Sequence, residues 1–362
     1  MGERRRRRGR GIKAGLAGLL AVGVLGAVFA PSALAEISGT VAGAPTAPVS
    51  ASPTPGAPGA GSMATAPRVV TTATTTWNAA AAATFWTSAR LADAAPVDAP
   101  KTTAAAGTAG TTGTTGTASG LGAHAMVGAR LSTPSSIARS THFGGASSTG
   151  VIFYASKDMT THYCTASVVD SHYGNLIIMA AHCNPGSWMA YVPKYQHGLS
   201  AARQPYGIWA VTKVFKDSHY TGGSGAGSDY DYAFAQVAKN SKGQSVQSVT
   251  GGNWLSHTTS YNMYVTALGY PKITADSADQ AIRCHPGYAT QKLPGYRQMV
   301  LYCTGFYGGT SGGPWLLGFN GNTGYLIGIT GGYEDGGPNS WISYSPVFDS
   351  RIFTLFQYAE YH

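Results

Sequence analysis

One serine stands among glycines in the stretch Gly308-Gly309-Thr310-Ser311-Gly312-Gly313-Pro314-Trp315. Glycine adopts backbone conformations that other residues avoid, so Ser311 can lie on a tight turn with its hydroxyl exposed. Backbone N–H groups of such a turn converge on one point, and we expect those of Gly309 and Ser311 to form an oxyanion hole. A glycine-rich turn whose serine has no chemical role is the alternative, because such turns are common.

A histidine that follows an apolar run is the second candidate. The run Ile177-Ile178-Met179-Ala180-Ala181 leads directly into His182 and Cys183, and a half-cystine next to a histidine would hold it in place. His182 could then accept the proton of Ser311 and return it to a leaving group. A single histidine after an apolar strand is more often structural, so this motif gains weight only together with the others.

Two aspartates compete for the role of the acid that orients His182. Asp229 and Asp231 both precede the alternating run Tyr232-Ala233-Phe234-Ala235. We favour Asp231, because it stands at the mouth of that predicted strand, where a buried carboxylate could reach an imidazole. Asp229 instead follows the flexible run 222–228.

The segment around Ser311 also matches the nucleophile elbow of the α/β-hydrolases, many of which are esterases. That class needs its acid and histidine after the serine, yet the only histidine beyond Ser311 is His362. The elbow should also begin a helix, which Gly312-Gly313-Pro314 opposes. Chain order and local propensity therefore disfavour an esterase of this class.

The region after Thr141 consists of short β-rich runs separated by glycine-rich and polar turns, which is typical of an all-β barrel or sandwich. The last stretch, Arg351 to Tyr361, has apolar residues at a loose helical period and predicts a terminal helix. The predicted strands are Gly150–Tyr154, Tyr163–Val169, Leu176–Ala181, Gly207–Phe215, Tyr232–Val237, Met263–Leu268, Met299–Tyr302, Tyr325–Ile329 and Trp341–Val347.

Three motifs together resemble the trypsin/chymotrypsin-like serine peptidase superfamily: Ala180–Cys183, Asp231–Phe234 and Gly309–Pro314, in the family's order. The resemblance covers about residues 141–362 and looks closest to secreted bacterial members, including the glutamyl-endopeptidase-like group. It implies two six-stranded antiparallel β-barrels with a C-terminal helix, preceded here by a low-complexity N-terminal extension. It also implies a secreted serine endopeptidase that acts through an acyl-enzyme, with His182, Asp231 and Ser311 as the catalytic triad.

The chain departs from the family's pattern at its substrate pocket. Thr310 stands where family members place the aspartate that binds a new N-terminus. Gly305 stands where trypsin-like members place the aspartate that selects Arg or Lys. Thr330 stands where glutamate-selective relatives commonly have a histidine. The resemblance implies a pocket formed by Gly305, Thr330, Gly331 and Gly332 without defining its preference. A catalytically inactive, protease-like binding or cell-wall-associated protein is the alternative, although the three triad residues are all present.

The charge of the chain lies mostly in its N-terminal part. Residues 1–35 hold seven Arg/Lys and one Glu, whereas residues 141–362 hold twelve Arg/Lys and eleven acids. A nearly neutral body does not favour a nucleic-acid partner. The basic run, the apolar stretch Ala14 to Ala30 and Ala33-Leu34-Ala35 predict a cleavable export signal, so we expect a secreted, extracellular protein without a membrane anchor after signal removal.

Residues 36–140 are rich in Ala, Thr, Gly, Pro and Ser, and predict a low-complexity linker or pro-segment, with a protease domain over 141–362. An aromatic and alanine-rich island at Trp77–Leu91 is compatible with a pro-segment that packs on the protease, as in a zymogen, or with a spacer carrying a chance cluster. Arg130 and Arg139 are candidate processing points.

Export predicts that the four cysteines form disulfides. Of the three pairings possible, we favour Cys164 with Cys183 and Cys284 with Cys303, because each closes a short loop of 19 positions. A zinc site is disfavoured by the spacing. We expect no metal and no cofactor, a monomer, and protein or peptide substrates.

Overall fold

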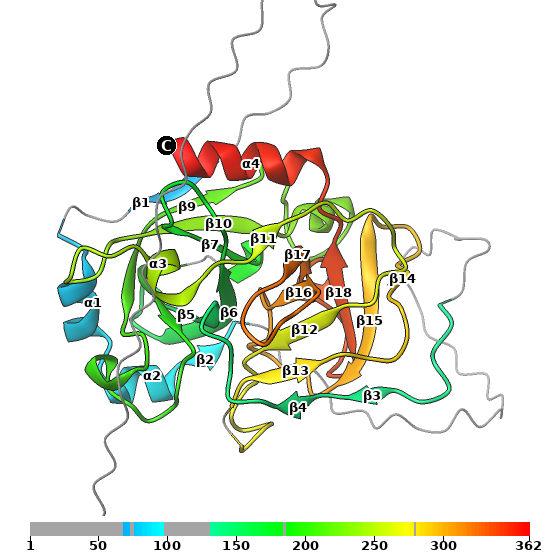
Figure 1. Ribbon diagram of the computed structural model, residues 1–362, viewed down its shortest axis with the longest axis horizontal. Coiled ribbons are helices and arrows are strands. Elements are labelled where there is room, and N and C mark those ends of the chain that lie inside the picture. Colours follow the sequence, from blue (N-terminus) through cyan, green and yellow to red (C-terminus); the bar gives the residue numbers. More distant parts are fainter. Residues whose placement is uncertain (1–67, 73–75, 98–130, 184–185, 279) are drawn as a thin grey trace, which may run out of the picture. The chain divides into compact units, whose positions relative to one another are not determined.

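The computed structural model describes residues 68–72, 76–97, 131–183, 186–278 and 280–362, and shows a mostly β protein. The export signal predicted at 1–35 lies outside these residues. Two β bodies follow each other along the chain, from about residue 149 to 237 and from about 254 to 346, with a helix at the C-terminus (Figure 1). Both the predicted fold class and the predicted terminal helix are confirmed.

The first body is a closed antiparallel barrel. Its strand order is β9-β10-β7-β6-β5-β8, and β8 pairs back onto β9 to close the ring. The strands are rich in β-branched and aromatic residues, and Ile152, Ile177, Val214 and Ala235 share the face that lines the interior. The strands are β5 (Thr149–Ala155), β6 (Thr161–Val168), β7 (Leu176–Met179), β8 (Ser187–Pro193), β9 (Trp209–Lys216) and β10 (Ala233–Val237).

The second body is barrel-like and is built from two sheets around a core that includes Ala267, Leu301, Trp315 and Ile327. One sheet contains β4 (Thr141–His142), β11 (Trp254–Leu255), β12 (Thr266–Gly269), β13 (Ile282–Cys284), β16 (Pro314–Leu317) and β17 (Tyr325–Ile329). The other contains β3 (Ala138–Arg139), β14 (Gln291–Lys292), β15 (Gln298–Thr304) and β18 (Ile342–Pro346).

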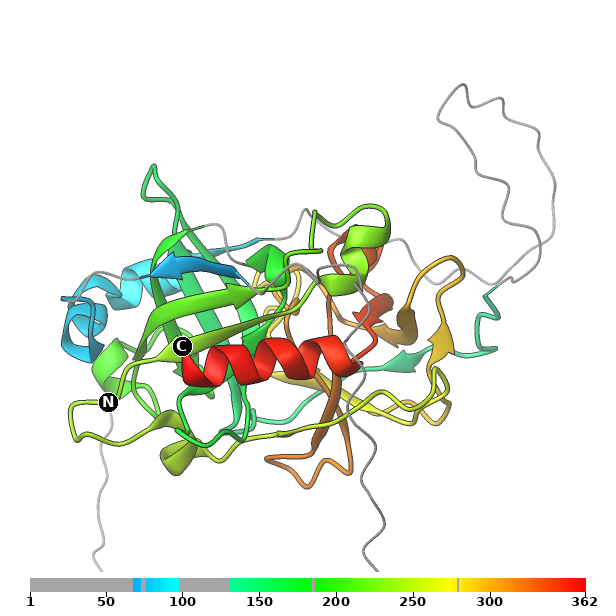
Figure 2. The ribbon, with the colours of Figure 1, turned by 90° about the horizontal axis from the view of Figure 1, so that it is seen from above.

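The helices are short except for the last. Helix α4 (Ser350–Tyr361) begins at Asp349, whose side chain accepts a hydrogen bond from the Arg351 N–H. It buries Ile352 and Leu355 and runs along β9 and β10, as Figure 2 shows. No helix among the described residues is long and apolar enough to cross a membrane. The other helices of the two bodies are α3 (Val246–Thr250) and the 3₁₀ turns η1 (Ala181–Cys183), η2 (Ala201–Arg203), η3 (Ala226–Tyr230) and η4 (Tyr333–Asp335).

Part of the N-terminal extension packs on the first barrel. The described residues there form β1 (Arg68–Thr72), α1 (Ala79–Phe85), α2 (Ser88–Asp93) and β2 (Ala95–Pro96). Strand β1 pairs with β9, and β2 pairs in parallel with β6. The side chains of Asn78 and Thr87 accept hydrogen bonds from backbone N–H groups in the first turns of α1 and α2. The alanine-rich island therefore forms two capped helices.

Candidate active site

The strand pairing of the first barrel brings His182 and Asp231 together. His182 lies on η1, directly after β7, and Asp231 lies between η3 and β10. Strands β7 and β10 are antiparallel neighbours, with Met179 opposite Ala233. Because the end of one antiparallel strand lies beside the start of its partner, residues 49 positions apart in sequence become neighbours in space.

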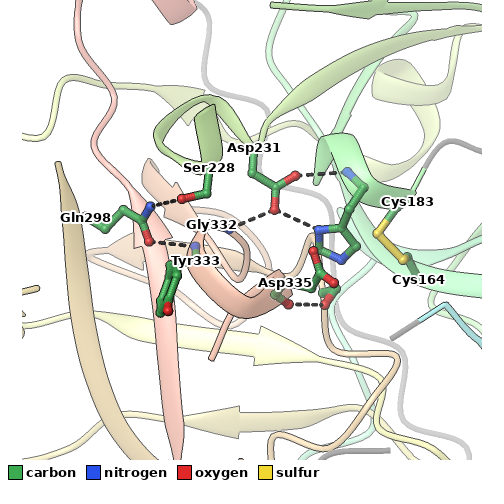
Figure 3. Close-up of polar contacts among 10 residues, drawn as sticks. Cys164, Cys183, Ser228, Asp231, Gln298, Gly332, Tyr333 and Asp335 are labelled. Atoms are coloured by element: carbon green, nitrogen blue, oxygen red, sulfur yellow. Dashed lines mark hydrogen bonds and ion pairs between the residues drawn. A yellow bond between two sulfur atoms is a disulfide. The ribbon is translucent and has the colours of Figure 1, made fainter. Parts of the chain in front are cut away.

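The carboxylate of Asp231 is buried, with 0% of the residue exposed. Its Oδ2 accepts hydrogen bonds from Nδ1 of His182 and from the N–H of Gly332, both at 2.7 Å, and its Oδ1 accepts one from the His182 N–H at 2.9 Å (Figure 3). Both oxygens are thus engaged by donors, which fixes the carboxylate and orients the imidazole. The other ring nitrogen of His182, Nε2, does not contact Asp231. It is then the nitrogen that can exchange protons with a substrate or a nucleophile.

A disulfide holds the segment that carries His182. Cys183 is bonded to Cys164 on β6, and Cys284 on β13 is bonded to Cys303 on β15. This is the pairing that short loops favoured in the sequence. The ligand atoms of Cys164, His182 and Cys183 lie within 4.8 Å of one another. The two sulfur atoms are bonded to each other, however, and are therefore not thiolate ligands for a metal.

Ser311 lies on a turn that fits against the first barrel. Gly309 and Gly312 have φ angles of +96° and +80°, which glycine adopts without strain. A Cβ at Gly312 would lie 2.2 Å from the carbonyl oxygen of Thr165 and 3.0 Å from the amide nitrogen of Ala180. The carbonyl of Ser311 accepts a hydrogen bond from the Thr165 N–H at 2.9 Å. The serine turn therefore contacts both β6 and the segment that ends in His182.

The hydroxyl of Ser311 is buried in this structure. The residue is 0% exposed, and its Oγ donates a hydrogen bond to the backbone carbonyl of Asp335 at 3.3 Å. Glu334 and Asp335 both have positive φ angles, 52° and 50°, which strain a residue with a side chain. The turn η4 therefore contacts the Ser311 hydroxyl directly.

The four predicted pocket residues have different surroundings. A Cβ at Gly305 would meet Ser140 Oγ at 2.2 Å, so this position faces the segment after β3. The hydroxyl of Thr330 accepts a hydrogen bond from the Trp315 indole N–H at 3.1 Å, within the core. Gly331 and Gly332 both adjoin Asp231, and the second donates to it.

The rival acid, Asp229, has other partners. Its Oδ1 accepts hydrogen bonds from the Arg297 N–H at 3.1 Å and from Nε2 of Gln298 at 2.9 Å. Gln298 is fully buried, donates to Ser228 Oγ, and accepts from the Tyr333 N–H (Figure 3). This network, which joins η3 to η4, was not predicted, because a glutamine at the start of a strand carries no distinctive pattern.

Tyr220 adjoins the acidic side of the site. Burial, together with the negative charges of Asp231 and Asp335, raises the pKa of Tyr220 well above its ordinary value. Its phenol, which is neutral at pH 7 even at its ordinary pKa, therefore remains neutral in more alkaline solution as well.

Comparisons with known proteins give relatives by structure only. No protein-family model and no curated protein matches the sequence. The protease Anisep from Arthrobacter nicotinovorans is similar in structure, with a TM-score of 0.52 and 23% identity over 62% of this chain and 100% of that one. The thermostable serine protease AL20 from an extremophilic microorganism has a TM-score of 0.51 and 24% identity over 59% of this chain and 97% of that one.

A Glu endopeptidase is also found, with a TM-score of 0.46 and 17% identity over 62% of this chain and 98% of that one. The two structures with TM-scores above 0.5 are both proteases, and their likeness to this chain is one of fold. The chain therefore has the fold of the chymotrypsin-like bacterial serine proteases.

Proposed function

We propose that the chain is a secreted serine endopeptidase that hydrolyses peptide bonds through an acyl-enzyme, with His182, Asp231 and Ser311 as its triad. The observation that carries this proposal is the hydrogen bond of 2.7 Å between His182 Nδ1 and the buried Asp231, on the barrel against which the serine turn packs. A buried carboxylate on one imidazole nitrogen leaves the other nitrogen as a base.

In the first step, the Oγ of Ser311 attacks the carbonyl carbon of the peptide while its proton passes to Nε2 of His182. The N–H groups of Gly309 and Ser311 stabilise the negative charge on the former carbonyl oxygen. The protonated imidazole then gives its proton to the leaving amine, and the C–N bond breaks. Asp231 holds the tautomer with hydrogen on Nδ1 and stabilises the imidazolium.

In the second step, water replaces the amine. His182 removes a proton from the water as it attacks the acyl-enzyme, and the proton returns to Ser311 Oγ when the ester bond breaks. The sum is hydrolysis of one peptide bond with the enzyme unchanged. No metal or cofactor takes part in these steps.

The chain is organised, in this proposal, as an export signal over 1–35, an extension over 36–140 and a protease domain over 141–362. The two disulfides support an oxidising compartment, because such bonds persist outside the cytosol. We expect an extracellular monomer that acts on protein or peptide substrates, without a nucleic-acid partner.

A fluorophosphonate probe tests this function, because only an activated serine reacts with it quickly. The secreted wild type should be labelled on Ser311, Ser311→Ala should not be labelled, and casein hydrolysis should disappear in the same variant. His182→Ala should retain the fold and lose labelling. If the wild type is labelled no faster than Ser311→Ala, the chain is a protease-like binding protein instead.

A further inference from the structure

Strand β6 continues past the serine turn, and the chain's own N-terminal extension lies on that edge. On the edge of β6 that faces away from β5, the Thr165 N–H donates to the carbonyl of Ser311 at 2.9 Å. Two residues earlier, the carbonyl of Tyr163 accepts a hydrogen bond from the Val97 N–H at 3.2 Å. Alternate residues of a strand direct their backbone groups to the same edge, about 7 Å apart. The Val97 backbone is therefore hydrogen-bonded to β6 directly next to the serine turn.

The side chain of Tyr163 strengthens this proximity. A Cβ at Gly309 would lie 2.5 Å from the Tyr163 ring, so the ring packs on the residue that offers an oxyanion donor. In the adjacent strand β2, Ala95 and Pro96 are paired in parallel with His162 and Tyr163. The extension thus adds a strand to one edge of β6. A substrate peptide bound across Ser311 would continue along that same edge.

We propose that residues 76–97 are an inhibitory segment in cis, whose strand β2 occupies the edge of β6 that extended substrates need. This inference rests on the proposed function and adds its regulation. A peptide chain extended beyond the scissile bond has to displace β2 to pair with Tyr163. A substrate without such an extension does not reach that edge and escapes the competition.

Two tryptophans anchor the inhibitory segment, residues 76–97, on the outer face of the barrel. The indole N–H of Trp77 donates to the carbonyl of Met189 at 2.9 Å, and that of Trp86 donates to the carbonyl of Trp188 at 2.8 Å. Trp86 is fully buried, and its ring lies 5.4 Å from that of Phe153. A segment held by two buried indoles remains seated when no substrate competes with it.

The contact surface is apolar and continuous with the barrel. Ala82 and Leu91 of the two helices are buried at 0% and 2% exposure, in one cluster with Val151, Ala190 and Ile208 of the barrel. The hydrophobic anchors thus lie on β5, β8 and the start of β9, whereas the blocking contact lies on β6. A change at Val97 can therefore release β2 without removing the anchors.

Val97→Pro tests the proposal, because proline has no N–H to donate to Tyr163. Val97→Ala is the matched control, since it shortens the side chain and keeps the donor. In the full secreted chain, Val97→Pro should hydrolyse casein roughly five- to tenfold faster than Val97→Ala, the range expected for one backbone hydrogen bond. Hydrolysis of p-nitrophenyl acetate, which has no extended chain, should be equal in the two variants. A cooperative thermal transition in each variant would show that both are folded.

Equal casein rates in the two variants, with fluorophosphonate labelling of Ser311 intact, would overturn the inhibitory role. Absence of labelling in every variant would instead refute the proposed function. In that case, hydrogen exchange tests separately whether β2 is paired with β6. Slow exchange of the Val97 amide in the wild type supports the seated strand, and exchange at the rate of an unstructured peptide contradicts it. If Val97→Pro does not fold, the same exchange measurement on the wild type tests whether β2 is paired with β6.

Discussion

The two β bodies contribute to the candidate site in different ways. In the first barrel, His182 and Asp231 lie at the ends of two paired strands, and both oxygens of the acid are hydrogen-bonded. In the second body, Ser311 lies on a glycine turn that keeps its place by contacts with the first barrel. The acid–base pair therefore lies at the ends of two strands of one barrel and takes one further donor, the Gly332 N–H, from the second body, whereas the whole serine turn is placed by how the two bodies fit together.

The largest effect should come from the acid of the first barrel. Asp231→Asn keeps the shape but no longer favours the His182 tautomer with hydrogen on Nδ1, so kcat should fall by about 10⁴-fold. Casein and p-nitrophenyl acetate hydrolysis should fall together, because both need the same base. The matched control, Asp229→Asn, keeps an oxygen that can accept from Gln298 and should lower kcat by less than tenfold. Equal losses in the two variants would refute the assignment of the acid.

The sequence was sufficient to predict most of the first barrel. All five of its predicted strands are found, because their apolar runs are flanked by glycine-rich or polar turns. Strand β8 was missed; it ends at Pro193, a residue depleted in strands, and Trp188 within it has a positive φ that the sequence does not reveal. Strand β16 was missed for a similar reason, because it begins at Pro314 directly after the glycines.

Only the residues of the site that lie in recognisable motifs could be predicted from the sequence. The partners of Asp231 include Gly332, a residue expected only in the pocket, because no local pattern tells which distant N–H meets a buried acid. The link through Gln298 and the covering of Ser311 by Asp335 likewise depend on loops that meet only in the folded chain. Long-range backbone contacts of this kind leave no periodic signal in the sequence.

The fit between the two bodies can be broken at one glycine. A Cβ at Gly312 would lie 2.2 Å from the Thr165 carbonyl oxygen, a backbone atom that cannot swing away. Gly312→Ala should therefore move Ser311 and lower kcat/KM by about 10²-fold, as a misplacement of about 1 Å does. Gly318→Ala is the matched control, because Gly318 also has a positive φ, +59°, but nothing lies within 4 Å of a Cβ there.

Both glycine variants should lose comparable stability from the strained backbone, so a comparison of their unfolding temperatures isolates the steric clash. Activity close to that of the wild type in Gly312→Ala, with Gly318→Ala also active, would mean that the serine turn is not positioned by β6. The comparison of the two bodies would then have to be abandoned.

The two disulfides provide a smaller and more selective comparison. Each links cysteines 19 positions apart, so removal of either should cost a similar free energy of unfolding, about 3 kcal/mol. The bond of Cys183 adjoins His182, whereas that of Cys284 lies inside the second body. The double variant Cys164→Ala/Cys183→Ala should therefore lose about tenfold more activity than Cys284→Ala/Cys303→Ala, measured well below both unfolding temperatures. Equal activities would show that the first disulfide does not position the histidine.

The smallest effect on catalysis should come from Gln298, which joins the bodies without touching the acid–base pair. Its buried amide donates to Ser228 and Asp229 and accepts from the Tyr333 N–H. Gln298→Met removes the acceptor of the Tyr333 N–H and one donor each to Ser228 and Asp229, at a cost of about 1–3 kcal/mol in unfolding free energy. Gln298→Glu keeps the acceptor for Tyr333 but places a carboxylate against Asp229, and should be destabilised more at neutral pH than at acidic pH.

For Gln298→Met, the rate on p-nitrophenyl acetate should stay within about threefold of the wild type, because the bond from His182 to Asp231 is untouched. A fall as large as that of Gly312→Ala would show that η3 and η4 transmit their position to the acid–base pair. In that case the second body would position the acid–base pair through η4 as well as through the Gly332 N–H, and the geometry of the pair would be shared between the two bodies.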